Sequence, residues 1–173
     1  MEINWYVLDK KYVEYLSKTD PKVGYVEYGD RLKLHVGILL EINDVTYYVP
    51  VSSPKEKHCK MNNSLDFHKL VDANTGKLYA VININNMIPV PEKCATQLKY
   101  DAIEDFRKFS NDDDRINYIY LLQKEKELID SAEETLRTKA QRLHEKCTEN
   151  PDSKLAKRCC DFITLEKICK EYK

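Results

Sequence analysis

The stretch that decides the fold is LHVGILLEINDVTYYVPV, residues 34–51. In residues 34–42 apolar side chains alternate with other residues, which predicts a β-strand that buries one face. The predicted buried face consists of Leu34, Val36, Ile38, Leu40 and Ile42. Asn43-Asp44 suits a tight two-residue turn, so residues 45–51 are predicted to return as the partner strand of a hairpin.

Working outward, the N-terminal half continues to favour strands. Asp9 is suited to cap a helix from residue 10 to about 17, because a short carboxylate accepts hydrogen bonds from the first turn. Residues 22–32 carry glycines and charges and are predicted to be a loop. Further strands are predicted at 5–8, 67–71 and 78–84. Two prolines in the segment 88–91 predict the end of the sheet region, since proline cannot donate to a central ladder.

The second half favours helices. A capping-box pattern at Asp101 and Glu104 predicts a helix to about residue 109. A long helix is then predicted to about residue 146, and a last helix after Asn150-Pro151. The long helix carries one apolar stripe, made of Leu122, Ile129, Ala132, Leu136, Ala140 and Leu143.

These elements indicate an α+β protein with an antiparallel sheet. We expect one domain over residues 1–173, with a β-rich core over about 1–91 and a helical part over about 101–173. Strands joined by short connections favour closure into a compact, strongly bent β-barrel with helices around it.

Composition narrows the function classes. The chain of 173 residues has a net charge of −1, from 28 basic and 29 acidic side chains, so any nucleic-acid surface must be a local basic patch. No apolar run is long enough to span a membrane and the N-terminus lacks a signal-peptide pattern, which favours the cytoplasm. Four glycines and no Gly-x-x-x-x-Gly-Lys exclude a P-loop enzyme.

The six cysteines are predicted to be reduced thiols in that compartment. No Cys-x-x-Cys pair is present, so the sequence predicts no zinc site and no metal cofactor. Cys159 and Cys169 are interpreted as small apolar residues of a helix.

The segment YVPVSSPKEKH, residues 48–58, carries the strongest chemical signal. Two hydroxyls and two lysines follow the end of a predicted strand, and such donors suit a phosphate oxygen. A polar turn is the alternative interpretation. His58 is a candidate general acid or base, and His35 on the preceding strand is its rival.

In these residues the chain resembles the type III toxin–antitoxin endoribonucleases of the ToxN/AbiQ family, and among them the lactococcal phage-resistance members. The resemblance spans nearly the whole chain, and two elements carry it most specifically. These are Pro50-Val51-Ser52-Ser53-Pro54-Lys55 and Met87-Ile88-Pro89. Serine at position 52 stands where relatives can carry threonine, a change that keeps the hydroxyl.

The resemblance implies a barrel like that of the Kid/MazF toxins and metal-independent cleavage of RNA. The products would be a 2′,3′-cyclic phosphate and a 5′-hydroxyl. It also implies a closed ring of three toxins and three antitoxin RNA pseudoknots, with abortive phage infection as the biological output.

Site residues follow from the motif and the resemblance together. Lys55 is assigned to charge stabilisation, and Ser52 and Ser53 to positioning by hydrogen bonds, because a serine is a poor base unless activated. Lys33 precedes the alternating strand and is expected to flank the same cleft. The resemblance alone selects Tyr12 and Tyr28, as groups that stack on a base or donate to a phosphate. The predicted basic groove for RNA also includes Lys10, Lys11, Lys57 and Lys60.

Two other classes stay open from the residues alone. A non-catalytic RNA-binding module would use the same cleft and never produce cyclic-phosphate ends. A protein-interaction domain would use the long helix as a coiled-coil seam. The alanines of the apolar stripe fit core packing equally well.

Overall fold

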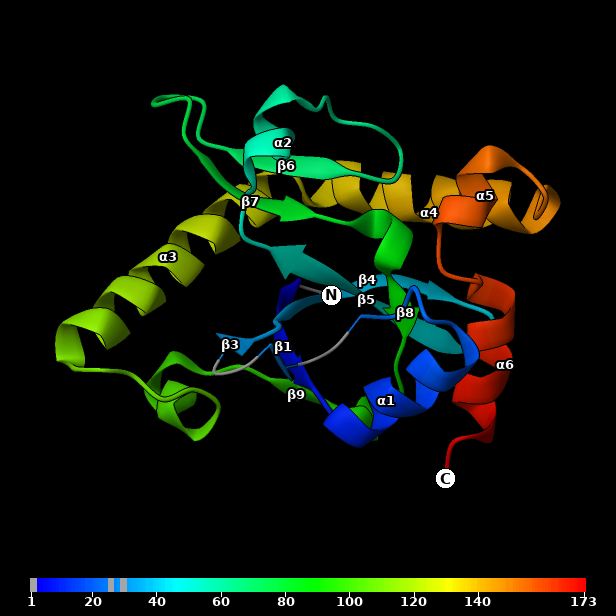
Figure 1. Ribbon diagram of the computed structural model, residues 1–173, viewed down its shortest axis with the longest axis horizontal. Coiled ribbons are helices and arrows are strands. Elements are labelled where there is room, and N and C mark those ends of the chain that lie inside the picture. Colours follow the sequence, from blue (N-terminus) through cyan, green and yellow to red (C-terminus); the bar gives the residue numbers. More distant parts are fainter. Residues whose placement is uncertain (1–2, 25–26, 29–30) are drawn as a thin grey trace.

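The computed structural model describes residues 3–24, 27–28 and 31–173. The predicted hairpin lies at its centre (Figure 1): β4 (His35–Ile42) pairs antiparallel with β5 (Val45–Ser52). Asn43 and Asp44 have φ angles of 52° and 62°. These left-handed values are those of the tight turn that matches the twist of a hairpin, which confirms the prediction.

Five further strands complete the main sheet, and every pair is antiparallel. The order is β6-β7-β5-β4-β1-β9, and β8 pairs with β5 beside this path. The two-residue strands β2 (Glu27–Tyr28) and β3 (Arg31–Leu32) pair with each other within the predicted loop. The other strands are β1 (Asn4–Leu8), β6 (His68–Val71), β7 (Leu78–Ile82), β8 (Ile88–Pro89) and β9 (Ala95–Gln97).

The sheet is open, and the predicted closure into a barrel is not seen. Among the described strands, β6 and β9 are its two edges. Helix α3 (Asp112–Ser131) packs against β6 and β7. The apolar surface near the β6 edge is therefore covered by a helix, and strand pairing around a barrel is not needed to bury it.

The sheet also extends past the prolines, where the prediction was wrong. In β8, Pro89 lies opposite Tyr47 of β5, and β9 pairs with β1 beyond residue 91. Proline is tolerated here because β8 is a two-residue strand at the side of the sheet, where no long ladder depends on its missing N–H.

The alternation in β4 predicts only part of its burial. Leu39, placed on the outer face by the pattern, is 1% exposed, and Ile38 is only half-buried. The register against β5 shifts between Val36 and Leu40. In addition, α4 (Glu133–Glu149) packs on β4, and Arg137 donates a hydrogen bond of 2.8 Å to the Ile38 carbonyl. A strand covered on both faces cannot keep one polar face.

The helices follow their capping signals. Asp9 accepts a hydrogen bond of 2.8 Å from the Tyr12 N–H at the start of α1 (Lys10–Thr19), as predicted. The predicted long helix is divided at Ala132 into α3 and α4, and its stripe is still buried at Leu122, Ile129 and Leu136. The predicted last helix is also two helices, α5 (Lys154–Arg158) and α6 (Phe162–Glu171), capped by Ser153 and Asp161.

The shorter helices are α2 (Glu56–Lys60) and the 3₁₀ turns η1 (Ile84–Asn86), η2 (Glu92–Cys94) and η3 (Tyr100–Asp105). A 3₁₀ turn, η3, thus stands where a helix over residues 101–109 was predicted.

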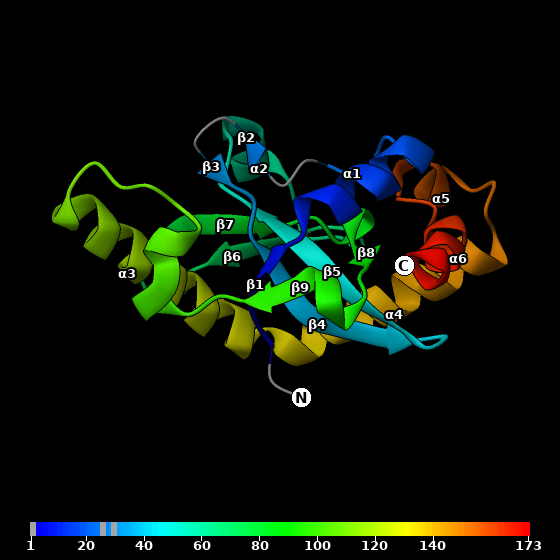
Figure 2. The ribbon, with the colours of Figure 1, turned by 90° about the horizontal axis from the view of Figure 1, so that it is seen from below.

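Figure 2 shows how the helices flank the sheet. Helices α3 and α4 run along one side, and α1, α2 and the β2–β3 pair lie on the other. Within the described ranges, no helix is long and apolar enough to cross a membrane. All six cysteines lie in those ranges and carry free thiols; Cys169 is within α6, and Cys159 ends α5.

One carboxyl group in the core makes stability depend on pH. Glu125 of α3 is 6% exposed, and its burial raises the pKa to about 7. A folded-state pKa above that of the unfolded chain means that the folded protein binds the proton more tightly. Its contribution to stability is therefore greatest at low pH and is lost as the pH rises from about 4.5 to 7.

Glu125→Gln should consequently stabilise the protein at alkaline pH. We expect its advantage in unfolding free energy over the wild type to grow by about 2 kcal/mol between pH 5 and pH 8, measured by urea denaturation. Glu127→Gln, on the exposed side of the same helix, is the matched control and should show no such growth. An advantage that is the same at both pH values would mean that Glu125 titrates normally.

Candidate active site

A cavity of about 260 Å³ lies where the ends of β4 and β5 meet α1 and η1. Its polar lining comes from four segments that are distant in sequence, and consists of Lys22, Lys33, His35, Ser52, Asn83 and Asn86. Val13 and Ile88 provide apolar walls. A hollow of about 550 Å³ between β4 and α4 is larger, but Arg137 there is engaged in holding the two elements together.

Lys33, Ser52 and Asn83 form the polar centre of this cavity. Lys33 Nζ donates a hydrogen bond to Ser52 Oγ, and Asn83 Nδ2 donates to the same oxygen at 3.3 Å. Ser52 is the last residue of β5, and Lys33 lies two residues before His35, which pairs with Pro50 across the ladder. The antiparallel register therefore brings together two residues that the sequence separates by 19 positions.

The electrostatics of the centre favour an amine that exchanges protons near neutral pH. Burial, followed by the positive charge of Lys55, lowers the pKa of Lys33 to about 8. Lys55 is itself exposed, in the loop that leaves β5. Lys55 is not among the residues that line the cavity, but its charge acts on Lys33. Two neighbouring cations and a hydroxyl can hold an anion such as a phosphate.

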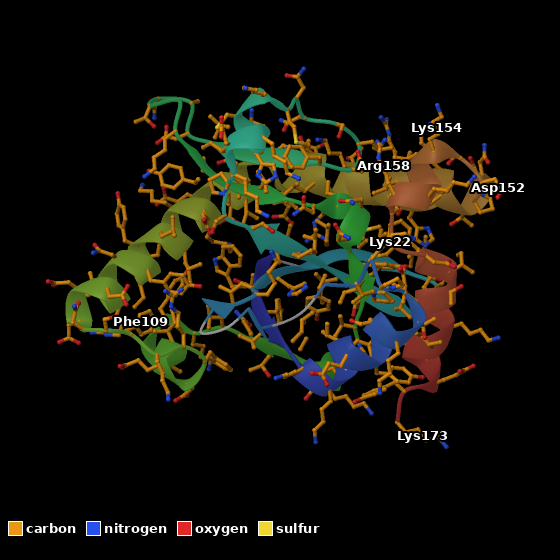
Figure 3. The ribbon with its side chains drawn as sticks, viewed as in Figure 1. Lys22, Phe109, Asp152, Lys154, Arg158 and Lys173 are labelled. Carbon is orange, nitrogen blue, oxygen red and sulfur yellow. The ribbon has the colours of Figure 1, made fainter. Side chains whose placement is uncertain are left out.

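The turn η1, which carries the amide side of the cavity, is held by the C-terminal part of the chain. Asn85 accepts a hydrogen bond of 2.8 Å from the Cys160 N–H, and its side chain donates to the Arg158 carbonyl. Arg158 projects from α5 (Figure 3) and makes two hydrogen bonds, of 2.6 and 3.1 Å, to Asp66. Asn86 Nδ2 donates to the Lys22 carbonyl at 2.9 Å. The tail therefore fixes the side of the cavity that faces β5.

His35 also lines this cavity. It is 4% exposed, and its Nδ1 is buried without a hydrogen-bond partner among the described residues. Burial, followed by the charge of Lys33, lowers its pKa to about 3, although the Lys33 backbone acts in the opposite direction. The imidazole is therefore neutral at physiological pH.

The rival histidine, His58, is placed differently. Its Nδ1 accepts a hydrogen bond of 3.0 Å from the Lys55 N–H, and its ring packs 5.6 Å from that of Phe67. Burial lowers its pKa, as do the charges of Lys57 and Lys55. His58 thus shapes the start of α2, and it does not line the cavity. Ser53 follows Ser52, the last residue of β5, and its side chain is exposed.

Of the two tyrosines selected by resemblance, the structure describes the side chain of Tyr12 only. Tyr12 is fully buried, and its hydroxyl donates to the Pro89 carbonyl at 2.6 Å, an arrangement that joins α1 to β8. Burial raises its pKa well above the usual range. The side chain of Tyr28 lies outside the described residues.

The predicted RNA-binding lysines are all exposed, in two groups. Lys10 and Lys11 begin α1, the helix whose Val13 lines the cavity. Lys57 and Lys60 lie on α2, directly after Lys55. None of the four belongs to the cavity lining among the described residues.

Sequence reasoning missed Asn83, Asn86 and Lys22. A weak signal for the first two was present, since three asparagines occur within the five residues 82–86, just after a predicted strand. Lys22 gave no signal, because a lysine after a helix-ending proline is common on surfaces.

Comparisons with known proteins identify the relatives of this chain. Residues 4–170 match the family model described as "Toxin ToxN, type III toxin-antitoxin system". Over 174 residues the chain is 31% identical to the endoribonuclease ToxN of Bacillus thuringiensis subsp. kurstaki, covering 98% of this chain and 84% of that protein.

Two solved structures share the fold over almost their full lengths. One comes from work on selective toxin inhibition by a non-coding RNA pseudoknot in type III systems. It has a TM-score of 0.83 at 27% identity, covering 99% of this chain and 98% of the other. The second is AbiQ, described as a lactococcal anti-phage endoribonuclease of a type III system, with a TM-score of 0.82 at 25% identity and the same coverage.

Proposed function

Because the chain belongs to the ToxN family of type III toxin–antitoxin systems, we propose that it is an endoribonuclease toxin. The observation that carries this proposal is the hydrogen-bonded centre of Lys33, Ser52 and Asn83 in the cavity beside Lys55. The relatives named above, an endoribonuclease and an anti-phage endoribonuclease, support the same activity.

The reaction proposed is attack of a ribose 2′-hydroxyl on the adjacent phosphate, which needs no metal ion. The 2′-oxygen bonds to phosphorus, the bond to the 5′-oxygen breaks, and the products carry a 2′,3′-cyclic phosphate and a 5′-hydroxyl. Ser52 and Ser53 position the phosphate, and Lys55 stabilises its developing charge. Lys33, with a pKa of about 8, is suited to protonate the leaving 5′-oxygen.

The remaining predicted residues receive supporting roles in this proposal. The burial of Tyr12 and its bond to Pro89 support a structural role. The bond from the Lys55 N–H to His58 supports a role for the imidazole in aiming the Lys55 loop. Tyr28 stays a prediction as an RNA-contacting residue.

RNA cleavage by the purified protein should continue in excess EDTA, because lysine side chains supply the positive charge that a metal ion would otherwise provide. Bulk bacterial RNA is incubated with the protein, and the ends of the fragments are analysed for cyclic phosphate. Complete inhibition by EDTA that one divalent ion reverses would contradict this mechanism. Retention of RNA without any cleavage would instead favour a non-catalytic RNA-binding module.

The proposed partner is a folded RNA antitoxin made of pseudoknot repeats, assembled with the toxin in a ring of three proteins and three RNAs. Inhibition by an RNA pseudoknot in the structural relative supports the partner. The biological output would be abortive phage infection, with toxin and RNA both in the bacterial cytoplasm. The inhibitory RNA would occupy the cleavage groove and compete with substrates.

The lysines at the start of α1 test this groove. Replacing Lys10 and Lys11 together by alanine should weaken antitoxin binding. The slope of log affinity against log salt should become shallower by about 1 to 2, because binding with fewer phosphate contacts releases fewer counterions. Affinity is measured across a salt series with a pseudoknot-repeat antitoxin RNA transcribed in vitro.

The matched control replaces Lys77 and Lys99, which are exposed on other segments. It should leave the slope unchanged. If the Lys10 and Lys11 variant gives the same affinities and slope as the wild type, these lysines lie off the path of the RNA.

A further inference from the structure

A further cavity, of about 570 Å³, lies where the end of α4 meets α5 and the start of α6. We call it the tail pocket. Its volume falls within the range of about 300–1,000 Å³ that is usual for ligand sites, and it exceeds that of the candidate active site. Apolar walls come from Pro151, Ala156, Phe162 and Ile163. The proposed reaction uses none of these residues.

Two neighbouring residues of α6 give the tail pocket one wall that is fixed by packing and one that is exposed to solvent. Phe162 is 2% exposed; its ring stacks on that of His144 at 5.8 Å and meets the Tyr47 ring edge-on at 5.9 Å. Ile163, the next residue, is 48% exposed. A ligand that covers this isoleucine removes apolar surface from water and gains hydrophobic free energy. The tail pocket therefore suits a ligand with an apolar face.

The charged residues of the tail pocket favour an anion. Lys22 and Lys157 both line it, and Lys157 is exposed and forms no ion pair with another described residue. Asp161 is the one acidic residue of this lining within the described ranges. Its two carboxylate oxygens are already occupied at the start of α6, by the Thr164 N–H at 3.1 Å and the Thr164 hydroxyl at 2.7 Å. A ligand that joins an apolar face to a negative charge matches this lining.

Lys22 lines both the tail pocket and the cavity of the candidate active site, so the two adjoin. Asn86 Nδ2 donates to the Lys22 carbonyl at 2.9 Å, and the Lys22 N–H donates to Asp20 at 2.9 Å. Asp20 also accepts a hydrogen bond of 2.7 Å from the Asp161 N–H, at the start of α6. Figure 3 shows Lys22 on the side of the molecule that carries Arg158. A strand bound at the active site can therefore continue past Lys22 into the tail pocket.

An unpaired nucleotide has the properties that this lining requires, because its base is flat with apolar faces and a phosphate lies on either side. We propose that the tail pocket binds one unpaired nucleotide of the RNA held at the active site, with its base against Ile163 and its flanking phosphates at Lys22 and Lys157. This inference rests on the proposed function. Proteins that bind single-stranded RNA use the same combination of covered bases and backbone charges. The tail pocket adds affinity for an RNA that spans both cavities and takes no part in bond cleavage.

The test measures coupling between one base of the RNA and one side chain of the pocket. The probe is an oligonucleotide that spans a cleavage site mapped with the wild type and extends several nucleotides on both sides. It carries 2′-deoxyribose at the cleaved nucleotide, so that it stays intact, and each flanking nucleotide is made abasic in turn. We expect one position at which loss of the base weakens binding to the wild type by about 5- to 30-fold. The same change should weaken binding to Ile163→Asp by less than about twofold.

Lys157→Ala tests the phosphate contact. It should weaken binding of the full oligonucleotide and make the slope of log affinity against log salt shallower by about 1. The cleavage rate at saturating RNA should stay at the wild-type value, since the tail pocket lies outside the reacting bond. Two matched controls should bind and cleave like the wild type: Ile116→Asp, at a 54% exposed isoleucine of α3, and Lys167→Ala, at an exposed lysine of α6 outside the lining.

Two results would overturn the inference: no flanking position that responds to loss of its base, or a response that Ile163→Asp leaves intact. The first would leave the tail pocket to a small anionic ligand or to a protein. If the wild type cleaves no RNA, no site can be mapped and the proposed function fails instead. Should Ile163→Asp not fold, 4-thiouridine at the responding position is cross-linked to the wild type. The cross-linked peptide must then come from residues 147–163, and a cross-link elsewhere would overturn the inference.

Discussion

Lys55→Ala should lower the rate of RNA cleavage by about 10²- to 10³-fold, the usual loss when a donor to a developing negative charge is removed. Two effects combine. The phosphate loses the Lys55 ammonium, and Lys33 loses the neighbouring charge that helps to lower its pKa. The measurement is the single-turnover rate on an RNA with a mapped site, together with growth arrest on expression in bacteria.

The fold should be unaffected, because Lys55 is exposed and substitutions at such positions change stability little. Lys77→Ala, in a turn away from the site, is the matched control and should cleave at the wild-type rate. A soluble Lys55→Ala protein that arrests growth normally would show that another group stabilises the phosphate.

Glu166→Ala should lower the free energy of unfolding by about 3–5 kcal/mol, the largest loss of stability that we expect. Glu166 of α6 is 6% exposed and accepts hydrogen bonds from the Tyr47 hydroxyl at 2.7 Å and from Asn43 Nδ2 at 3.0 Å. His144 Nε2 of α4 lies 2.6 Å from the same carboxylate. Removal of the carboxylate leaves the buried side chains of Tyr47 and His144 without a common partner and opens a cavity.

Urea denaturation of the wild type and three variants measures this effect. Glu166→Gln keeps the side-chain volume and one acceptor oxygen and should lose less than Glu166→Ala. Glu171→Ala, exposed on the same helix, should lose less than about 0.5 kcal/mol. A loss below about 1 kcal/mol for Glu166→Ala would mean that water replaces the carboxylate in the network.

The parts of the fold that could be predicted from the sequence are those with strong local signals. Asn43-Asp44 predicted a tight turn and Asp9 predicted a helix start, and both signals are independent of the rest of the chain. The open edges of the sheet, the pairing of β9 with β1 and the division at Ala132 depend on contacts between distant segments. No window of local sequence contains that information.

The same distinction applies to the candidate site. Ser52 and Lys55 lie in one motif, and Lys33 precedes the strand that leads to it, so all three could be predicted. Asn83 reaches Ser52 because β7 pairs with β5, and this register was not readable from either strand alone. His58 was chosen over His35 because it is close to Lys55 in sequence, whereas the cavity is closed by residues that are close in space.

The contacts of Arg158 and Cys160 with Asp66 and Asn85, which hold η1 in place, form late during synthesis of the chain. Lys33, Ser52 and Asn83 have all left the ribosome long before Arg158 and Cys160, which bind Asp66 and Asn85, are even translated. A nascent chain therefore carries the groups for cleavage without the contacts that hold η1 in place. For a toxin, completion of the site by residues near the end of the chain delays full activity until translation is almost finished.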